Sequence, residues 1–143
     1  MSGYTITRVF AAPRNLVWEA FTQPEHFAVW WGGRMAKVED TRMDVRVGGT
    51  WSARMILPEG NIDWDGEYLE VVPPERLVMT LTDRANESDA RDKFTITLTD
   101  LGDKTELVLT QDGGNLTDEQ YVHAKEGTSA FLDTMAELLA ELQ

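Results

Sequence analysis

The chain of 143 residues contains no cysteine, which excludes disulfides, thiolate nucleophiles and cysteine-ligated zinc, and fits a reducing compartment. It also contains no run of 18 apolar residues, and its first eight residues have neither a basic segment nor an apolar core typical of a leader. The two histidines, His26 and His123, are far apart in the sequence and lack metal-ligand spacing. We therefore expect a cytoplasmic protein with no membrane partner, no bound metal and no cofactor.

Positive charge is scarce, because 13 Lys and Arg residues face 25 Asp and Glu residues and give a net charge of -12. Such a charge repels phosphate backbones and anionic lipids unless a basic stripe overcomes it. No stripe is visible, since Arg42 and Arg46 alternate with Asp40 and Asp44. We expect no nucleic-acid partner. The length fits one domain spanning residues 1–143.

The most informative segment that is present is the C-terminal one, from Thr117 to Gln143. Its apolar residues recur at steps of three and four, the period of a helix with one buried face. Thr117 and Gln120 fit a capping box at its start. A helix of about 26 residues spans about 39 Å and needs a wide partner surface. The pattern predicts one long helix that packs against a sheet.

The rest of the chain reads mostly as strands. An alternating segment at residues 4–11 is followed by two short helices that begin near Pro13 and Pro24, the second ending at Gly32-Gly33. Period-two patterns then predict six more strands, with a hairpin at Gly48-Gly49 and a bulge near Gly66. Residues 83–92 read as a charged loop. The predicted class is α+β, with a seven-stranded antiparallel sheet wrapped on the C-terminal helix.

Several motifs resemble one known family across the whole chain. They are Ala12-Pro13, Val17-Trp18, Phe21-Thr22, Pro24-Glu25-His26, Trp30-Trp31-Gly32, Gly48-Gly49, residues 66–71, residues 73–77, and Thr105 with Leu107. The set is similar to the bacterial family named after the activator of the heat shock protein 90 ATPase, within the START-related (SRPBCC) superfamily. The resemblance implies the helix-grip fold and a cavity between sheet and helix that accepts small apolar or amphipathic molecules. One departure is Thr128, because members commonly have tryptophan after the glycine that corresponds to Gly127.

The favoured hypothesis is a protein that binds a small hydrophobic or aromatic molecule without catalysis. A ligand cavity is mostly apolar and contains a few convergent polar groups. Aromatic rings and flexible methionines suit such a lining. The predicted ligand-binding residues are Trp51, Met55, Trp64, Met79, Phe94, Tyr121, Phe131 and Met135.

Two alternatives stay open at this point. One is an enzyme similar to polyketide cyclases or hydrolases, with Asp65 or Glu67 as general base and Arg54 stabilising an enolate. The simpler interpretation is that these residues form the solvated face of a strand, with Arg54 paired to Asp65 or Glu67. The other alternative is a chaperone ATPase regulator in the stress response, which would bind its partner through an exposed patch that includes Trp30 and Trp31.

Overall fold

A computed structural model describes residues 3–84 and 91–143, so most of the predicted charged loop lies outside the described residues. The elements follow one another in the predicted order. They are β1 (Gly3–Phe10), α1 (Arg14–Thr22), α2 (Pro24–Trp30), the 3₁₀ turn η1 (Gly33–Met35), β2 (Lys37–Met43), β3 (Thr50–Leu57), β4 (Gly60–Val72), β5 (Arg76–Asp83), β6 (Asp92–Asp100), β7 (Thr105–Asp112) and α3 (Asp118–Glu141).

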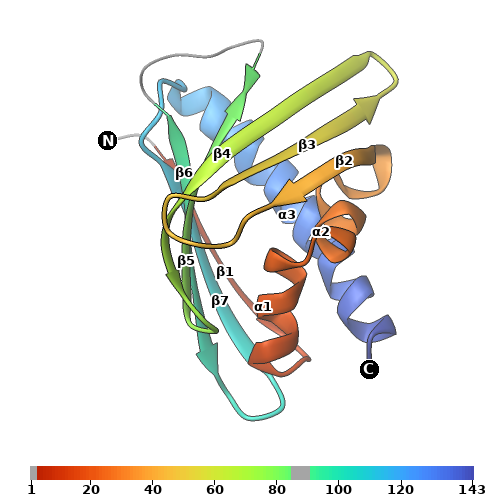
Figure 1. Cartoon of the computed structure of the whole chain (residues 1–143), viewed down its shortest axis with the longest axis vertical. Coiled ribbons are helices and arrows are strands. Elements are labelled where there is room, and N and C mark those ends of the chain that lie inside the picture. The colour runs from red at the N-terminus through yellow and green to blue at the C-terminus, as the bar shows by residue number, and fades with distance from the viewer. Residues whose placement is uncertain (1–2, 85–90) are drawn as a thin grey trace.

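Within the described part of the chain, the seven strands form one antiparallel sheet in the order β1-β7-β6-β5-β4-β3-β2. The first strand therefore lies beside the last, and the remaining strands follow as a meander. Figure 1 shows the curved sheet, with α3 running across it and α1 and α2 beside the C-terminal part of α3. The predicted helix-grip fold is confirmed.

The long helix begins as the sequence predicts. Thr117 accepts a hydrogen bond from the Gln120 backbone N–H at 3.1 Å, and the Gln120 side chain accepts one from the Thr117 N–H at 2.8 Å. This capping box satisfies two backbone N–H groups that the first turn leaves free. The buried stripe of α3 runs along Tyr121, Thr128, Leu132, Met135, Leu138 and Leu139. The capping box and the stripe fix where α3 starts and which side faces the sheet.

Two local predictions are confirmed in kind and corrected in position. β2 and β3 pair as an antiparallel hairpin, but its connection is longer than Gly48-Gly49, because β2 ends at Met43 and the Gly48 N–H bonds the Tyr68 carbonyl at 2.9 Å. The bulge expected near Gly66 lies between Tyr68 and Glu70, where the β4–β5 register shifts. The shift turns both Tyr68 and Val71 inward, and this resolves the conflict between their sequence positions.

The core centres on a cluster of rings gathered around Trp31. Phe27 stacks on Trp31 at 5.2 Å, while Trp51 and Phe131 meet it edge-on at 5.7 Å and 5.2 Å between ring centroids. Each such aromatic pair stabilises by about 1 kcal/mol beyond its buried area. The cluster joins α2, β3 and α3.

Candidate functional site

A cleft of about 600 Å³ lies between the sheet and the N-terminal part of α3. The ends of β4, β5, β6 and β7, the segment before α3 and one face of α3 enclose it. Its apolar lining consists of Trp31, Trp64, Leu81, Phe94, Leu116, Ala124 and Phe131, with Gly114 and Gly127. Its polar lining consists of Thr82, Asp83, Arg91, Asp92, Gln111, Asn115, Gln120 and Thr128. The volume lies within the range of small-molecule pockets, about 300 to 1,000 Å³.

One side of the cleft, here called the aromatic wall, consists of Trp31, Trp64, Phe94 and Phe131. Trp31 is the central ring, with Trp64 at 5.5 Å and Phe94 at 6.0 Å in edge-on contact. The indole N–H groups of Trp31 and Trp64 are buried and lack a hydrogen-bond partner in the structure as described, with almost no exposed surface. This wall therefore presents ring surface rather than accessible donors.

A second part of the lining, here called the polar wall, consists of Asp92, Gln111 and Thr128, and it is part of a continuous hydrogen-bond network. The Tyr4 hydroxyl lies 2.5 Å from Gln111 Oε1 and 2.7 Å from Thr128 Oγ1. Gln111 Nε2 donates to Asp92 Oδ2 at 3.0 Å, and Tyr121 donates to Asp92 Oδ1 at 2.5 Å. The network connects β1, β6 and β7 to α3, so the polar wall is held in place from both layers.

Two tyrosines of this network keep their protons in strongly alkaline solution. Burial raises the pKa of Tyr4 to about 12. Burial, followed by the hydrogen bond to Asp92, raises the pKa of Tyr121 to about 12. Burial also raises the pKa of Tyr68, a residue of β4 that points into the core. At neutral pH all three hydroxyls are therefore protonated, and those of Tyr4 and Tyr121 donate within the network.

These shifts predict an alkaline loss of stability. The chain has three tyrosines, and all three have a pKa above the ordinary value of 10.0 in the folded state. Their contribution to the free energy of unfolding is complete below pH 10 and is lost as the pH rises towards 12, because the unfolded chain ionises first. Tyrosinate absorbance of the native protein should stay flat through pH 10. Stepwise ionisation there without unfolding would contradict the burial.

The structure places the predicted ligand-binding residues in three different surroundings. Trp64, Phe94 and Phe131 line the cleft. Trp51, Met55, Met79 and Met135 are buried in the core and do not line it. Tyr121 lies just behind the polar wall, with its hydroxyl on Asp92. Whether any of them contacts a ligand stays a prediction.

Sequence reasoning missed the polar wall and Trp31. A signal was present, because Gln111 shares strand parity with the buried Leu107 and Leu109. Asp92 likewise shares parity with the buried Phe94. A polar residue at an inward position near the end of a strand indicates a hydrogen-bonded interior site.

The three candidate catalytic residues lie on the outer face of the sheet. Arg54 donates to Asp63 at 2.9 Å, not to Asp65 or Glu67 as expected, because Asp63 is directly opposite it in the register of β3 and β4. That hydrogen bond raises the pKa of the Arg54 guanidinium. Asp65 accepts from Arg84 at 2.8 Å, and Glu67 is exposed. None of the three lines the cleft, so this set supplies no base for a reaction there.

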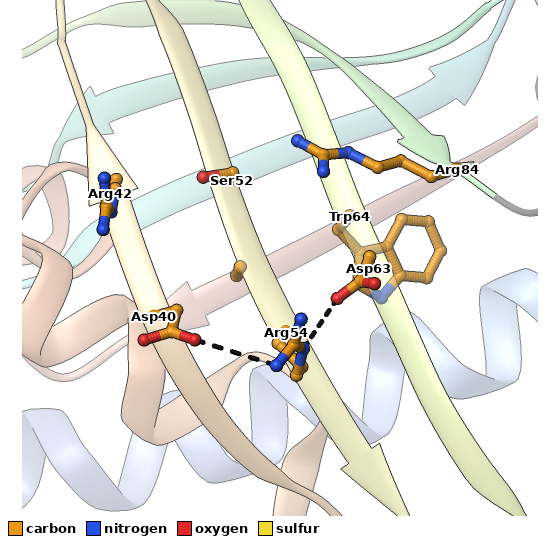
Figure 2. Close-up of a pocket in the computed structure, with 8 residues that line it drawn as sticks. Asp40, Arg42, Ser52, Arg54, Asp63, Trp64 and Arg84 are labelled. Carbon is orange, nitrogen blue, oxygen red and sulfur yellow. Dashed lines mark hydrogen bonds and ion pairs between the residues drawn. The ribbon is translucent and has the colours of Figure 1, made fainter.

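The same outer face has a polar depression of about 260 Å³. Figure 2 shows Arg54 between Asp40 and Asp63, with Arg42, Ser52 and Arg84 nearby. The charged groups here alternate in sign and largely pair with one another. Exposed pairs of this kind contribute under about 1 kcal/mol each. The depression lacks the apolar surface of the cleft, and we take the cleft as the candidate site.

The exposed tryptophan patch expected for a chaperone regulator is not formed by Trp30 and Trp31. Both are buried, at 1% and 2% exposure. The Trp30 indole donates to the Ala20 carbonyl at 2.7 Å, which ties α2 to α1. Two statements hold for residues 3–84 and 91–143. No helix is long and apolar enough to cross a membrane, and no group of three or more His, Asp or Glu residues is placed to hold a metal ion.

The fold and the cleft define the class as an α+β helix-grip domain with a pocket between its sheet and its long helix. The chain belongs to the family of Activator of Hsp90 ATPase homolog 1-like proteins, whose model matches residues 11–140. The comparison with functionally curated proteins gives no match.

Solved structures from several bacteria have the same fold. Protein CV1439 from Chromobacterium violaceum is 26% identical with a TM-score of 0.86, and 96% of each chain is covered. Protein NE0264 from Nitrosomonas europaea is 27% identical with a TM-score of 0.83, covering 98% of this chain and 95% of that one. The AHSA1 protein from Silicibacter pomeroyi is 21% identical with a TM-score of 0.83, covering 99% and 100%.

Proposed function

We propose that this protein binds one small hydrophobic or aromatic molecule in the cleft between the sheet and α3. The observation that carries the proposal is the cleft itself, about 600 Å³ with an aromatic wall and a polar wall. Binding an apolar ring there removes its surface from water, which contributes about 25 cal/mol per Å² before the costs of association. The polar wall would then fix the orientation of the molecule.

The balance of apolar and polar groups favours binding over catalysis. Of the two carboxylates that line the cleft, Asp83 and Asp92, Asp92 already accepts hydrogen bonds from Gly114, Gln111 and Tyr121. These bonds make Asp92 part of the network that joins the sheet to α3, and its remaining lone pairs can accept a hydrogen bond from a ligand. Its main role is therefore to hold and orient.

Native mass spectrometry tests the proposal. Freshly purified protein should have the mass of the chain plus one small molecule, or should form a one-to-one complex when naphthol is added to the bare chain. A bicyclic aromatic probe of this kind suits the ring surfaces of Trp31, Trp64 and Phe131. The proposal is wrong if no complex forms with a co-purified or an added aromatic molecule.

A further inference from the structure

We infer that the ligand of the cleft is a neutral molecule that donates a hydrogen bond, such as a phenol or an alcohol, and that Asp92 and Thr128 accept that bond. This inference rests on the proposed function, and it follows from counting the protons of the polar wall. Each hydroxyl has one proton to donate, so the direction of every hydrogen bond in the network is fixed once one end is known.

The end that fixes the direction is Asp92, a carboxylate. Its Oδ1 accepts from the Gly114 N–H at 3.0 Å and from the Tyr121 hydroxyl, and its Oδ2 accepts from Gln111 Nε2. Because the Gln111 amide nitrogen faces Asp92, its oxygen must face Tyr4. The Tyr4 hydroxyl therefore donates its proton to Gln111 Oε1.

The same reasoning fixes the hydroxyl of Thr128. Tyr4 has no second proton, so the 2.7 Å contact between Tyr4 and Thr128 must be a donation from Thr128. Thr128 then has lone pairs left but no proton. Both Thr128 and Gln111 are 5% exposed, so their polar atoms have little access to bulk water.

The hydrogen-bonding groups of the polar wall that remain free are mainly acceptors. Asp92 Oδ2 accepts a single bond among those described, and Thr128 Oγ1 accepts none. The one spare donor is the second N–H of Gln111. A carboxylate on the ligand would meet the Asp92 charge within a protein of net charge -12, so an anionic ligand is disfavoured.

Other donors of the lining do not reverse this balance. The indole N–H groups of Trp31 and Trp64, and the hydroxyl of Thr82, are buried with almost no exposed surface. Arg91, Asn115 and Gln120 line the cleft with exposed side chains that bulk water reaches, and solvent screens the Arg91 charge. The amphipathic arrangement therefore fits a ring against the aromatic wall and a hydroxyl on the polar wall.

Three probes with one ring system test the inference by isothermal titration of the wild-type protein. They are naphthol, which donates, methoxynaphthalene, which only accepts, and naphthoate, which is anionic. Naphthol should bind about tenfold more tightly than each of the others. A hydrogen bond to a charged group strengthens binding by about tenfold or more. Methoxynaphthalene is more hydrophobic than naphthol, so hydrophobicity alone would make methoxynaphthalene bind more tightly. Tighter binding of naphthol therefore has to come from its hydrogen bond.

The substitution Asp92→Asn tests the direction of the network. Its amide nitrogen would face Gln111 Nε2, so the Gln111 amide should turn over, Tyr4 should donate to Thr128, and the Thr128 proton should become free to point into the cleft. The preference should then move from naphthol towards methoxynaphthalene. A melting curve verifies that the variant folds. If it does not fold, the titration of the wild-type protein with the three probes still tests the inference.

The outcomes separate the two proposals. If naphthol and methoxynaphthalene bind wild type within about twofold of each other, the cleft binds ligands but the donor inference is wrong. If naphthoate binds most tightly, Arg91 sets the preference and the inference is again wrong. If none of the probes binds, the proposed function fails together with the inference.

Discussion

Replacing Gly66 with alanine should lower the free energy of unfolding by about 4 kcal/mol, a large part of the total for a domain of this size. A Cβ at Gly66 would collide with the Thr80 carbonyl oxygen and with Trp51 Nε1. Those two atoms form a buried hydrogen bond of 2.8 Å. Alanine therefore separates β4 from β5 and also leaves an indole donor unpaired.

Urea denaturation of the Gly66→Ala variant measures this effect, and Gly127→Ala is the matched control. A Cβ at Gly127 meets nothing within 4 Å, and the residue lies inside α3. The control should gain about 1 kcal/mol, because alanine is the better helix former. A Gly66→Ala variant as stable as the wild type would show that the close approach of Trp51 to β4 is not a constraint.

Replacing Gly127 with tryptophan should weaken naphthol binding by at least about tenfold without loss of stability. Gly127 lines the cleft, and the space around its Cβ position is open. A large ring at this position enters the volume that the ligand would occupy. Tryptophan also has a better helix propensity than glycine, so α3 should not be weakened.

The control for this variant is Val122→Trp, which adds the same ring to the same helix. Val122 is 57% exposed and does not line the cleft. This control should bind naphthol like the wild type, and the melting temperature of Gly127→Trp should not fall below that of the wild type. Equal affinity of the two variants for naphthol would mean that the ligand binds elsewhere.

Much of the fold could be predicted, because burial imposes a period on each element. The change from steps of three and four to steps of two separates α3 from the strands, and the capping box marks its first turn. The β2–β3 connection could not be placed in this way. Val45 and Val47 continue the alternation of β2, but the backbone there leaves the strand to bond with Tyr68.

The site could be predicted only in part. The spacing of residues shows which face of the sheet a side chain lies on, but not whether that side chain reaches the cleft. Met55, Met79 and Phe94 all point inward, yet only Phe94 reaches the cleft. The difference depends on how the helices pack on the sheet, which no local pattern contains. The polar wall also needs three-dimensional contact, since Tyr4 and Thr128 are 124 positions apart.

Nuclear magnetic resonance of the indole N–H groups during naphthol addition tests the central claim most directly. The rings of Trp31 and Trp64 line the cleft, whereas Trp30 and Trp51 donate to backbone carbonyls inside the core. The account predicts that the signals of Trp31 and Trp64 shift and broaden most, and that those of Trp30 and Trp51 change little. A shift of Trp64 alone, which also lines the outer depression, or no shifts at all, would contradict it.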